Sequence, residues 1–510
     1  MITPADALPD DAGLLKAMLI AERIESERLR QIIREFQRHR FGRRAESLSE
    51  DQLQLALEDA EQEAASGQAA SEQKHPPERK ARAARRRTNR GKLPAHLPRI
   101  ETVVDVPSTV CPCCAAMLHR IGEDVSERLD IVPAQFRVLV VRRPKYACRA
   151  CTDVVVQAPA PARLIEGGLP TEATVAQVLV SKFADHLPLY RQAQIYARQG
   201  VTLDRSTLAD WVGRAAFLLR PVHERLLDRL KASAKLFADE TTAPVLDPGR
   251  GRTKTGQLFA YARDDRPWGG TDPPGVVYVY APDRKAERPI AHLAGFKGIL
   301  QVDGYGGYKV LAKQGDVRLA FCWSHVRRHF YELATPGPAP IAAEALTRIA
   351  ALYRIEAEIR GRSAEERRSL RQERSRPLVE ALEPWLRMKL QLISQKTKLA
   401  AAIRYALSRW DGLCLFLDNG RVEIDNNVVE RSIRPLALTR KNALFAGSDG
   451  GAEHWAVIAS LIETCKLIGV EPYAYLAGVI TRIVDGHPNS RLDELLPWTY
   501  PATPNLKAVA

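Results

Sequence analysis

The sequence predicts a multidomain protein in which a helical front end and a cysteine module precede a mixed α/β domain, itself divided by an all-helical insertion. Three observations carry this prediction. The chain has 510 residues, enough for about three folded units. Most of its eight cysteines lie between positions 111 and 151. The hydrophobic pattern changes from helical spacing to short apolar strands near residue 235, and returns to helical spacing over residues 337–417.

The composition limits the function classes. Lys and Arg total 75 against 61 Asp and Glu, a net charge of +14 that favours a polyanionic partner such as nucleic acid. A basic soluble protein without such a partner is the alternative. No apolar run approaches the length of about 18 residues that a membrane span needs, and the first residues lack the regions of a secretory signal. We therefore expect a cytoplasmic protein with no membrane partner.

The first 100 residues are predicted to be helical and then basic. Apolar side chains at partly heptad spacing over residues 14–41 indicate a helix that pairs with another helix or docks alone on a core. We assign residues 1–65 to this helical, coiled-coil segment and residues 66–100 to a basic linker. The basic run has no apolar period, so it is either a solvated linker or a DNA-binding segment that orders on phosphates. Its DNA-binding candidates are Arg85, Arg86, Arg87, Arg90 and Lys92.

Residues 101–160 form the cysteine module. It contains two Cys-x-x-Cys turns, and two such turns complete a closed tetrahedral Zn²⁺ site, which is structural because no position remains open for water. The predicted ligands are Cys111, Cys114, Cys148 and Cys151. Cys113 can replace Cys114 as a ligand, and buried free thiols are the alternative. Residues 135–143, between the turns, are predicted to form a strand.

Residues 165–232 are predicted to be helical and to bind DNA. A turn at Gly200 precedes a helix that begins at Arg205 with polar and basic residues, which is the order of elements in a helix-turn-helix. An ordinary helical hairpin has the same pattern and is the alternative.

The mixed α/β domain is predicted in two parts, residues 233–336 and 421–484. Apolar strands are expected at 235–238, 256–263, 275–280, 298–302 and 317–321, with a helix at 287–293. Residues 337–420 are arginine-rich and lack strand signals, so they form the helical insertion. In the second part, Asp425 to Asn427 are expected to begin a helix that Pro435 ends. Residues 485–510 form a tail.

Three acidic residues are candidates for one site. Asp239 and Asp303 each follow a predicted apolar strand directly, which is where α/β sheets place ligands and catalytic groups. Glu430 lies near the start of the later helix. Three carboxylates suit Mg²⁺, and a pair of such ions supports phosphodiester chemistry. Each acid also has an ordinary alternative role, the two Asp residues in turns and Glu430 as a capping partner.

Specific strings of residues surround these acids. They are Ala238-Asp239-Glu240-Thr241, Val302-Asp303-Gly304-Tyr305, Cys322-Trp323-Ser324-His325, Asp425-Asn426-Asn427 through Glu430-Arg431, and the run 440–448. These strings, the N-terminal helix and the cysteine module closely resemble TnpC-type transposases of the bacterial insertion-sequence-sixty-six family. The resemblance extends over nearly the whole chain. It departs at Ile468, where a polar residue is usual, and at Ala477-Gly478, where a charged pair is usual.

The resemblance implies a DDE transposase with a ribonuclease-H-like catalytic core. Asp239, Asp303 and Glu430 match its catalytic acids, which hold two Mg²⁺ ions, with Mn²⁺ able to substitute. Cys322 and His325 match a recurring signature of such transposases. The role of this signature stays open between metal binding, DNA contact and packing.

We therefore expect an enzyme that cleaves and joins insertion-element ends by phosphodiester hydrolysis and strand transfer. Its partners are the terminal inverted repeats, target DNA, a second copy of the chain on DNA and accessory proteins of the same element, at the nucleoid of a bacterial cytoplasm. Lys254, Arg431 and Arg434 are assigned to DNA phosphates because of their charge and their place in the sequence. The alternatives are a catalytically inactive DNA-end-binding or regulatory protein and a ribonuclease-H-like nuclease of RNA.

Overall fold

The structure is a computed structural model, and it describes residues 135–147, 155–247, 252–313, 315–335 and 339–501, together with Asp11 and Gly13. The chain divides into two units, 1–134 and 135–510, and every helix and strand named below belongs to the second. The predicted N-terminal helix, the basic run and the four predicted zinc ligands lie outside the described residues.

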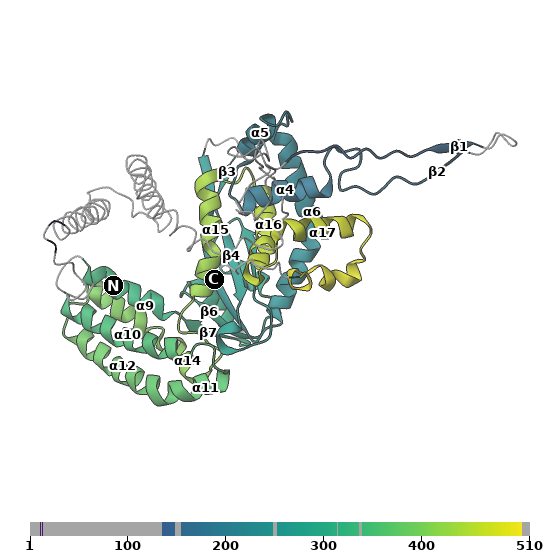
Figure 1. Cartoon of the computed structure of the whole chain (residues 1–510). Helices are drawn as coiled ribbons and strands as arrows, with labels where there is room; N and C mark the ends of the chain where they lie inside the picture. Colours follow the sequence, from purple (N-terminus) through teal and green to yellow (C-terminus); the bar gives the residue numbers. More distant parts are fainter. Residues whose placement is uncertain are drawn as a thin grey trace, which may run out of the picture. The chain divides into compact units, whose positions relative to one another are not determined.

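A five-stranded mixed sheet forms the centre of the second unit (Figure 1). Its strands are β3 (Lys235–Asp247), β4 (Arg252–Arg263), β5 (Gly275–Ala281), β6 (Gly298–Val302) and β7 (Val317–Phe321). The spatial order is β5-β4-β3-β6-β7. Strands β3, β4 and β5 pair antiparallel, whereas β6 and β7 run parallel to β3. The predicted mixed α/β domain is therefore confirmed.

Helices close the β5 edge of the sheet. The long helix α16 (Asp449–Ile468) packs against β5, and α6 (Arg205–Lys231) packs against α16. Ser460 Oγ accepts a hydrogen bond from the Tyr278 N–H at 2.8 Å, and Thr464 Oγ1 accepts one from the Val276 N–H at 3.1 Å. These side chains satisfy edge N–H groups that a further strand would otherwise bind.

The helical region before the sheet is confirmed, and it packs with the C-terminal part of the chain. Its helices are α4 (Glu172–Phe183), α5 (Leu189–Ala197) and α6, with a turn at Gly200, where φ is +79°. Helix α4 packs against α17 (Pro472–Val484). The tail continues as short 3₁₀ turns at Asn489–Leu495 and Pro497–Thr499, and buried Leu495 and Leu496 join the same core.

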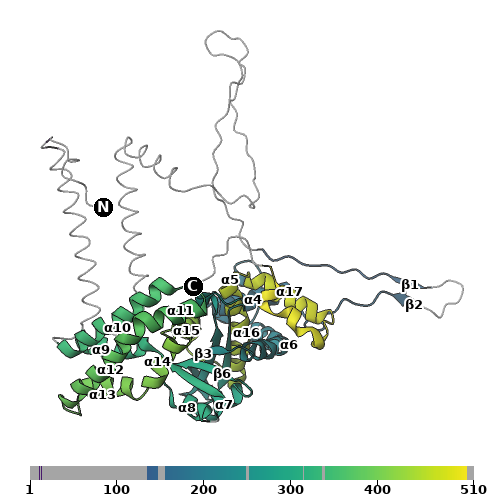
Figure 2. The same cartoon turned by 90° about the horizontal axis from the view of Figure 1, so that it is seen from below.

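The helical insertion is confirmed and lies at the β7 edge (Figure 1). It is on the opposite side of the sheet from α16 and α17 (Figure 2). It follows α9 (Trp323–Ala334) and comprises α10 (Pro340–Ile359), α11 (Ala364–Leu370), the π-helical turn Arg371–Ser375, α12 (Arg376–Gln391), α13 (Lys398–Leu407) and α14 (Trp410–Asp418). Gly412 lets α14 approach β7 closely, because a Cβ there would lie 2.4 Å from the Phe321 ring.

Buried ion pairs join the insertion to the sheet domain. Arg367 and Arg371 are almost fully buried, and both contact Glu356 on α10. Arg367 also donates to Glu423 at 2.8 Å, in the segment that leads back into the sheet domain. Gln301 on β6 holds the same segment, because its amide donates to the carbonyl oxygens of Glu423 and Asp425 at 2.7 and 2.8 Å.

Two predicted local features are wrong. Residues 135–143 form no ladder; the pairing in this region is between β1 (Lys145–Ala147) and β2 (Val155–Gln157). Pro435 does not end its helix, because α15 runs from Asn427 to Ala443. Proline inside a helix costs about 3 kcal/mol, and the burial of Ser432, Leu436 and Thr439 on the sheet side of α15 offsets that cost.

Candidate active site

Asp239 and Asp303 lie where two adjacent parallel strands part. The prediction that Asp239 follows a strand is wrong, because β3 continues through it to Asp247. However, β3 pairs with β6 only as far as Phe237, and β6 ends at Val302, directly before Asp303. Both acids therefore lie beyond the end of the parallel pairing, which is the edge where such sheets bind ligands.

The structure brings these two acids together and adds a third. Carboxylate oxygens of Asp239, Glu240 and Asp303 all lie within 4.8 Å of one another. Asp239 Oδ1 accepts a hydrogen bond from the Glu240 N–H at 2.8 Å, and Asp303 Oδ1 accepts one from the Tyr305 N–H at 2.9 Å. These bonds orient both carboxylates.

Crowding of these charges has a clear electrostatic effect. Burial, and next the charge of Asp303, raise the pKa of Asp239 to about 8, with smaller contributions from Glu240 and Glu430. A carboxyl is perturbed in this way when like charges share a site that lacks a balancing cation. The donor set is all oxygen, so the residues present fit a hard divalent cation such as Mg²⁺.

Glu240 belongs to this cluster, although the sequence did not single it out. Its side chain is 2% exposed and forms an ion pair with Arg284, and it accepts a hydrogen bond from the Tyr308 hydroxyl at 3.1 Å. Burial, and then Asp303, raise the pKa of Glu240, while Arg284 opposes that rise. Arg284 is distant in sequence, so no local pattern indicated this pair. Because Arg284 balances its charge, Glu240 is a weaker candidate ligand than Asp239.

Helix α15 carries Glu430 and is fixed to β3 at both ends. At its start, the Asn426 amide donates to the Ala238 carbonyl at 3.2 Å. Past its end, the Ala446 N–H donates to the Pro244 carbonyl at 2.9 Å. The Asn427 N–H is bound by the Asp425 carboxylate at 3.2 Å. The N-cap of the helix is Asn426, whose N–H donates to Cys322 Sγ at 3.2 Å, and the structure shows no capping bond from the Glu430 side chain.

The carboxylate of Glu430 lies closest to the Cys-x-x-His signature. Cys322 Sγ, His325 Nδ1 and a Glu430 oxygen all lie within 4.8 Å of one another. The Nδ1–Oε1 distance between His325 and Glu430 is 3.6 Å. Glu430 also raises the pKa of Asp239, so the two groups of residues are electrostatically linked. The structure therefore places the three predicted acids in one region, as two adjoining clusters.

The helical insertion supports the turn after the second acid. The Tyr405 hydroxyl on α13 donates to the Asp303 carbonyl at 2.6 Å, and Arg409 donates to the Gly304 carbonyl at 3.3 Å. Gly304 has φ +116°, a backbone conformation that favours glycine, and a Cβ there would lie 2.5 Å from Arg409 Nε. The insertion thus contributes to the geometry of the site, a link that the sequence did not indicate.

The basic candidates lie at different places. Arg431 and Arg434 are exposed on α15, next to Glu430 in the helix. Lys254 lies on β4 opposite Val245, well along the β3–β4 hairpin from Asp239, and its Nζ binds Asp449 at 2.6 Å. All three stay predicted phosphate contacts, and the linker arginines lie outside the described residues.

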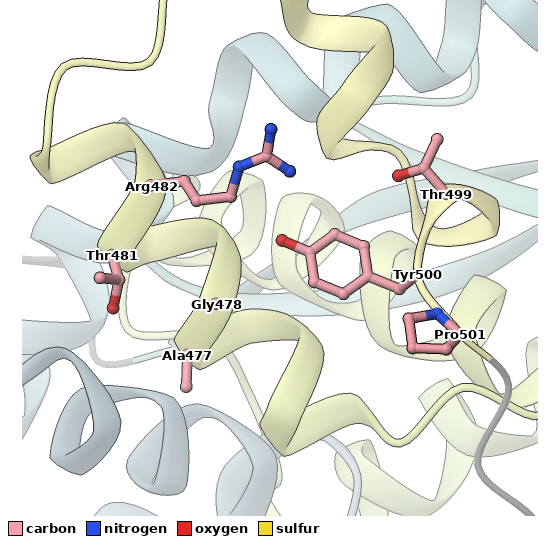
Figure 3. A pocket seen from close by; sticks show the side chains of 7 residues that line it. All are labelled: Ala477, Gly478, Thr481, Arg482, Thr499, Tyr500 and Pro501. Atoms are coloured by element: carbon pink, nitrogen blue, oxygen red, sulfur yellow. The ribbon is translucent and has the colours of Figure 1, made fainter.

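A shallow pocket of about 550 Å³ lies elsewhere, between α17 and the C-terminal segment (Figure 3). Its lining residues are Ala477, Gly478, Thr481, Arg482, Thr499, Tyr500 and Pro501. Its lining contains no carboxylate, so it does not compete with the acidic clusters as the candidate active site.

Comparison with known proteins identifies the family. The sequence profile of the Transposase IS66 family matches residues 167–454, more than half of the chain. The chain belongs to the IS66 transposase family. Three further IS66-type profiles match this transposase: the zinc-finger binding domain of transposase IS66 at 108–152, the IS66 C-terminal element at 460–498, and Transposase C of IS166 homeodomain at 28–102. The resemblance found in the motifs is confirmed.

Relatives of this transposase include three proteins of Sinorhizobium fredii, all named as uncharacterized. The protein y4jD is 46% identical over 98% of this chain and 98% of its own length. The protein y4qI is 44% identical over 98% and 99% of the two chains, and y4hP is 39% identical over 94% and 89%. The similarity to these proteins therefore extends over nearly the full length of this chain. In the part of the chain that the structure describes, no helix is long and apolar enough to cross a bilayer.

Proposed function

We propose that this IS66-family transposase cleaves the ends of its insertion element and joins them to target DNA, with Asp239, Asp303 and Glu430 as its catalytic acids. The observation that carries the proposal is the approach of Asp239 and Asp303 to within 4.8 Å at the end of the parallel pairing. Glu430 is included among the catalytic acids because its charge contributes to the raised pKa of Asp239. We further propose that the sheet domain is a ribonuclease-H-like core, which its mixed strand order supports.

In the proposed site, Asp239 and Asp303 would hold Mg²⁺ through oxygen atoms, and Mn²⁺ would substitute. Bound divalent ions would activate the attacking oxygen and stabilise the leaving one in phosphodiester chemistry. The protein's own contribution is orientation: backbone N–H groups fix both Asp carboxylates, and Tyr405 and Arg409 fix the turn after Asp303. Arg431 and Arg434, exposed beside Glu430, would hold phosphates of the DNA backbone.

The front of the chain would bind the element ends. We propose that the domains have the boundaries predicted from the sequence. We also propose that Cys111, Cys114, Cys148 and Cys151 hold a structural Zn²⁺, and that the linker and the helices of 165–232 bind DNA. The match to a zinc-finger domain at 108–152 supports the Zn²⁺ site, and the match to a homeodomain at 28–102 supports DNA binding by the linker. We also propose that the chain acts as a homo-oligomer on DNA, with accessory proteins of its element, at the nucleoid in the cytoplasm.

A cleavage assay with DNA from the flanks of the gene tests this function. The full chain, in Mg²⁺, is expected to nick a labelled duplex that carries the element end and to transfer its 3′ end to a second duplex. Asp239→Asn, Asp303→Asn and Glu430→Gln should each abolish both steps and retain DNA binding. The matched control is Asp316→Asn, because the Asp316 side chain is 62% exposed and pairs with Lys297 outside the site; this variant should cleave normally. Binding without cleavage by the wild-type chain would instead identify a DNA-end-binding or regulatory protein.

A further inference from the structure

Two buried polar atoms beside the acidic cluster have no hydrogen-bond partner. His325 Nδ1 and Glu430 Oε1 are both inaccessible to solvent, and neither has a hydrogen-bond partner. Buried polar atoms are nearly always paired, so each such atom calls for an explanation. The two atoms face each other at 3.6 Å, which exceeds the N–H···O limit of about 3.2 Å. They are therefore close together but not bonded to each other.

The distance between them fits a shared metal ion. An imidazole nitrogen and a carboxylate oxygen each bind a divalent transition metal at about 2.1 Å, so two ligands of one ion lie roughly 3.0–3.6 Å apart. The observed 3.6 Å between His325 Nδ1 and Glu430 Oε1 lies at the upper end of that range. One bound ion would satisfy both atoms with little movement of either side chain.

The backbone around this pair is held by hydrogen bonds from two directions. Cys322 is the N-cap of α9, and its sulfur accepts the Asn426 N–H at 3.2 Å. The Trp323 N–H donates to the Ile424 carbonyl at 3.0 Å. These bonds tie the start of α9, which carries His325, to the segment that begins α15, which carries Glu430. The two candidate ligands thus come from separate helices whose starts are fixed together.

We propose that His325 Nδ1 and Glu430 Oε1 bind one divalent transition-metal ion, of which Mn²⁺ is the probe. The sulfur of Cys322 is the acceptor that fixes the backbone beside the ion. This inference deepens the proposed function and rests on it for the role of Glu430 as a metal-binding acid. It makes the two metal positions chemically different: Asp239 and Asp303 offer oxygen alone, whereas the second position adds an imidazole nitrogen.

A mixed nitrogen and oxygen site discriminates between metals. Imidazole suits transition metals, whereas Mg²⁺ prefers oxygen ligands. Mn²⁺ should therefore bind the second position more tightly than Mg²⁺, while the Asp239–Asp303 position accepts either ion.

Pulsed electron paramagnetic resonance of Mn²⁺ on the full chain, without DNA, tests the inference. With up to two equivalents of Mn²⁺, the wild-type spectrum should contain the ¹⁴N coupling of a directly bound imidazole. His325→Ala and Glu430→Gln should each lose this coupling, and His325→Ala should still bind Mn²⁺ at Asp239 and Asp303. Cys322→Ser should keep the coupling, since its hydroxyl still accepts the backbone N–H.

Two further variants distinguish a failure of the metal-site inference from a failure of the proposed function. Asp303→Asn should keep the ¹⁴N coupling, because it disturbs only the all-oxygen position. His454→Ala, at a half-buried histidine on α16, is the matched control and should also keep it. Bound Mn²⁺ without ¹⁴N coupling in the wild type, or coupling that persists in His325→Ala, would overturn the inference. A wild-type chain that shows the coupling but does not cleave element-end DNA would instead count against the proposed function.

Discussion

Replacing Asp239 by asparagine should stabilise the transposase in Mg²⁺-free buffer at alkaline pH. In the folded chain, burial and the charge of Asp303 raise the pKa of Asp239 from 3.8 to about 8. The unfolded chain ionises this carboxyl near its ordinary pKa, and the folded chain does so only near pH 8. Because the folded pKa is the higher one, stability falls as pH rises between these values and then stays constant.

The size of the effect follows from the shift. A shift of about four units corresponds to an upper limit of roughly 6 kcal/mol, at about 1.4 kcal/mol per unit. Relaxation and water entry reduce such penalties, so we expect Asp239→Asn to raise the free energy of unfolding by about 2–3 kcal/mol at pH 8.5. The gain should fall well below about 1 kcal/mol at pH 4, where the folded wild-type chain holds the proton and the unfolded chain is only partly ionised.

Urea denaturation of both proteins at pH 4 and pH 8.5 measures this difference. Mg²⁺ should stabilise the wild type at pH 8.5, because the cation balances the crowded carboxylates, and should have little effect on Asp239→Asn. Asp316→Asn, at an exposed acid, should show neither behaviour. A variant that is no more stable than the wild type at pH 8.5, or whose gain is the same at both pH values, would refute the electrostatic reasoning.

Three further substitutions test packing around the site. Gln301→Leu should lower the free energy of unfolding by about 2–4 kcal/mol, because backbone groups of the Glu423 segment lose their partners; urea denaturation measures this loss. Arg371→Leu should cost about 3 kcal/mol by the same assay, because Glu356 loses its closest buried partner. Leu444→Gly should raise the melting temperature through a gain of about 1 kcal/mol, because Leu444 has φ +66° in a strained turn.

Each of these substitutions has a matched control in an exposed part of the insertion. Gln395→Leu and Arg387→Leu, whose side-chain bonds are exposed, should cost well under 1 kcal/mol. Leu392→Gly, at a helix C-cap with φ −85°, should destabilise slightly. Equal effects in a test variant and its control would show that the buried bond or the turn is not the cause.

The local hydrophobic pattern predicted the presence of helices and strands better than it predicted the residues at which they end. Apolar runs located all five strands of the sheet, and Asp303 was placed correctly because its strand ends in a turn. Asp239 was misplaced at a strand end because the pattern does not show that β3 continues alongside β4 after its pairing with β6 stops. Pro435 was predicted to end a helix whose buried face, packed on the sheet, offsets the local cost.

Contacts between residues that are far apart in the chain could not be predicted from the sequence. Arg284, which lies in the connection after β5, forms an ion pair with Glu240 on β3. Tyr405, which lies in the insertion, donates a hydrogen bond to the Asp303 carbonyl. Neither contact has a spacing or a composition that a linear pattern can reveal. Residues 337–420 were predicted only to be a helical insertion, and the sequence did not indicate that their buried arginines and Tyr405 help to position the acids.

The central claim is that Asp239 and Asp303 together hold a divalent cation. Anomalous diffraction from crystals of the full chain grown with Mn²⁺ tests it most directly. An anomalous peak is expected within about 2.2 Å of one carboxylate oxygen from each residue, and it should be lost in Asp303→Asn crystals. Mn²⁺-containing crystals with no peak between these two carboxylates, or with an unchanged peak in Asp303→Asn, would contradict the claim.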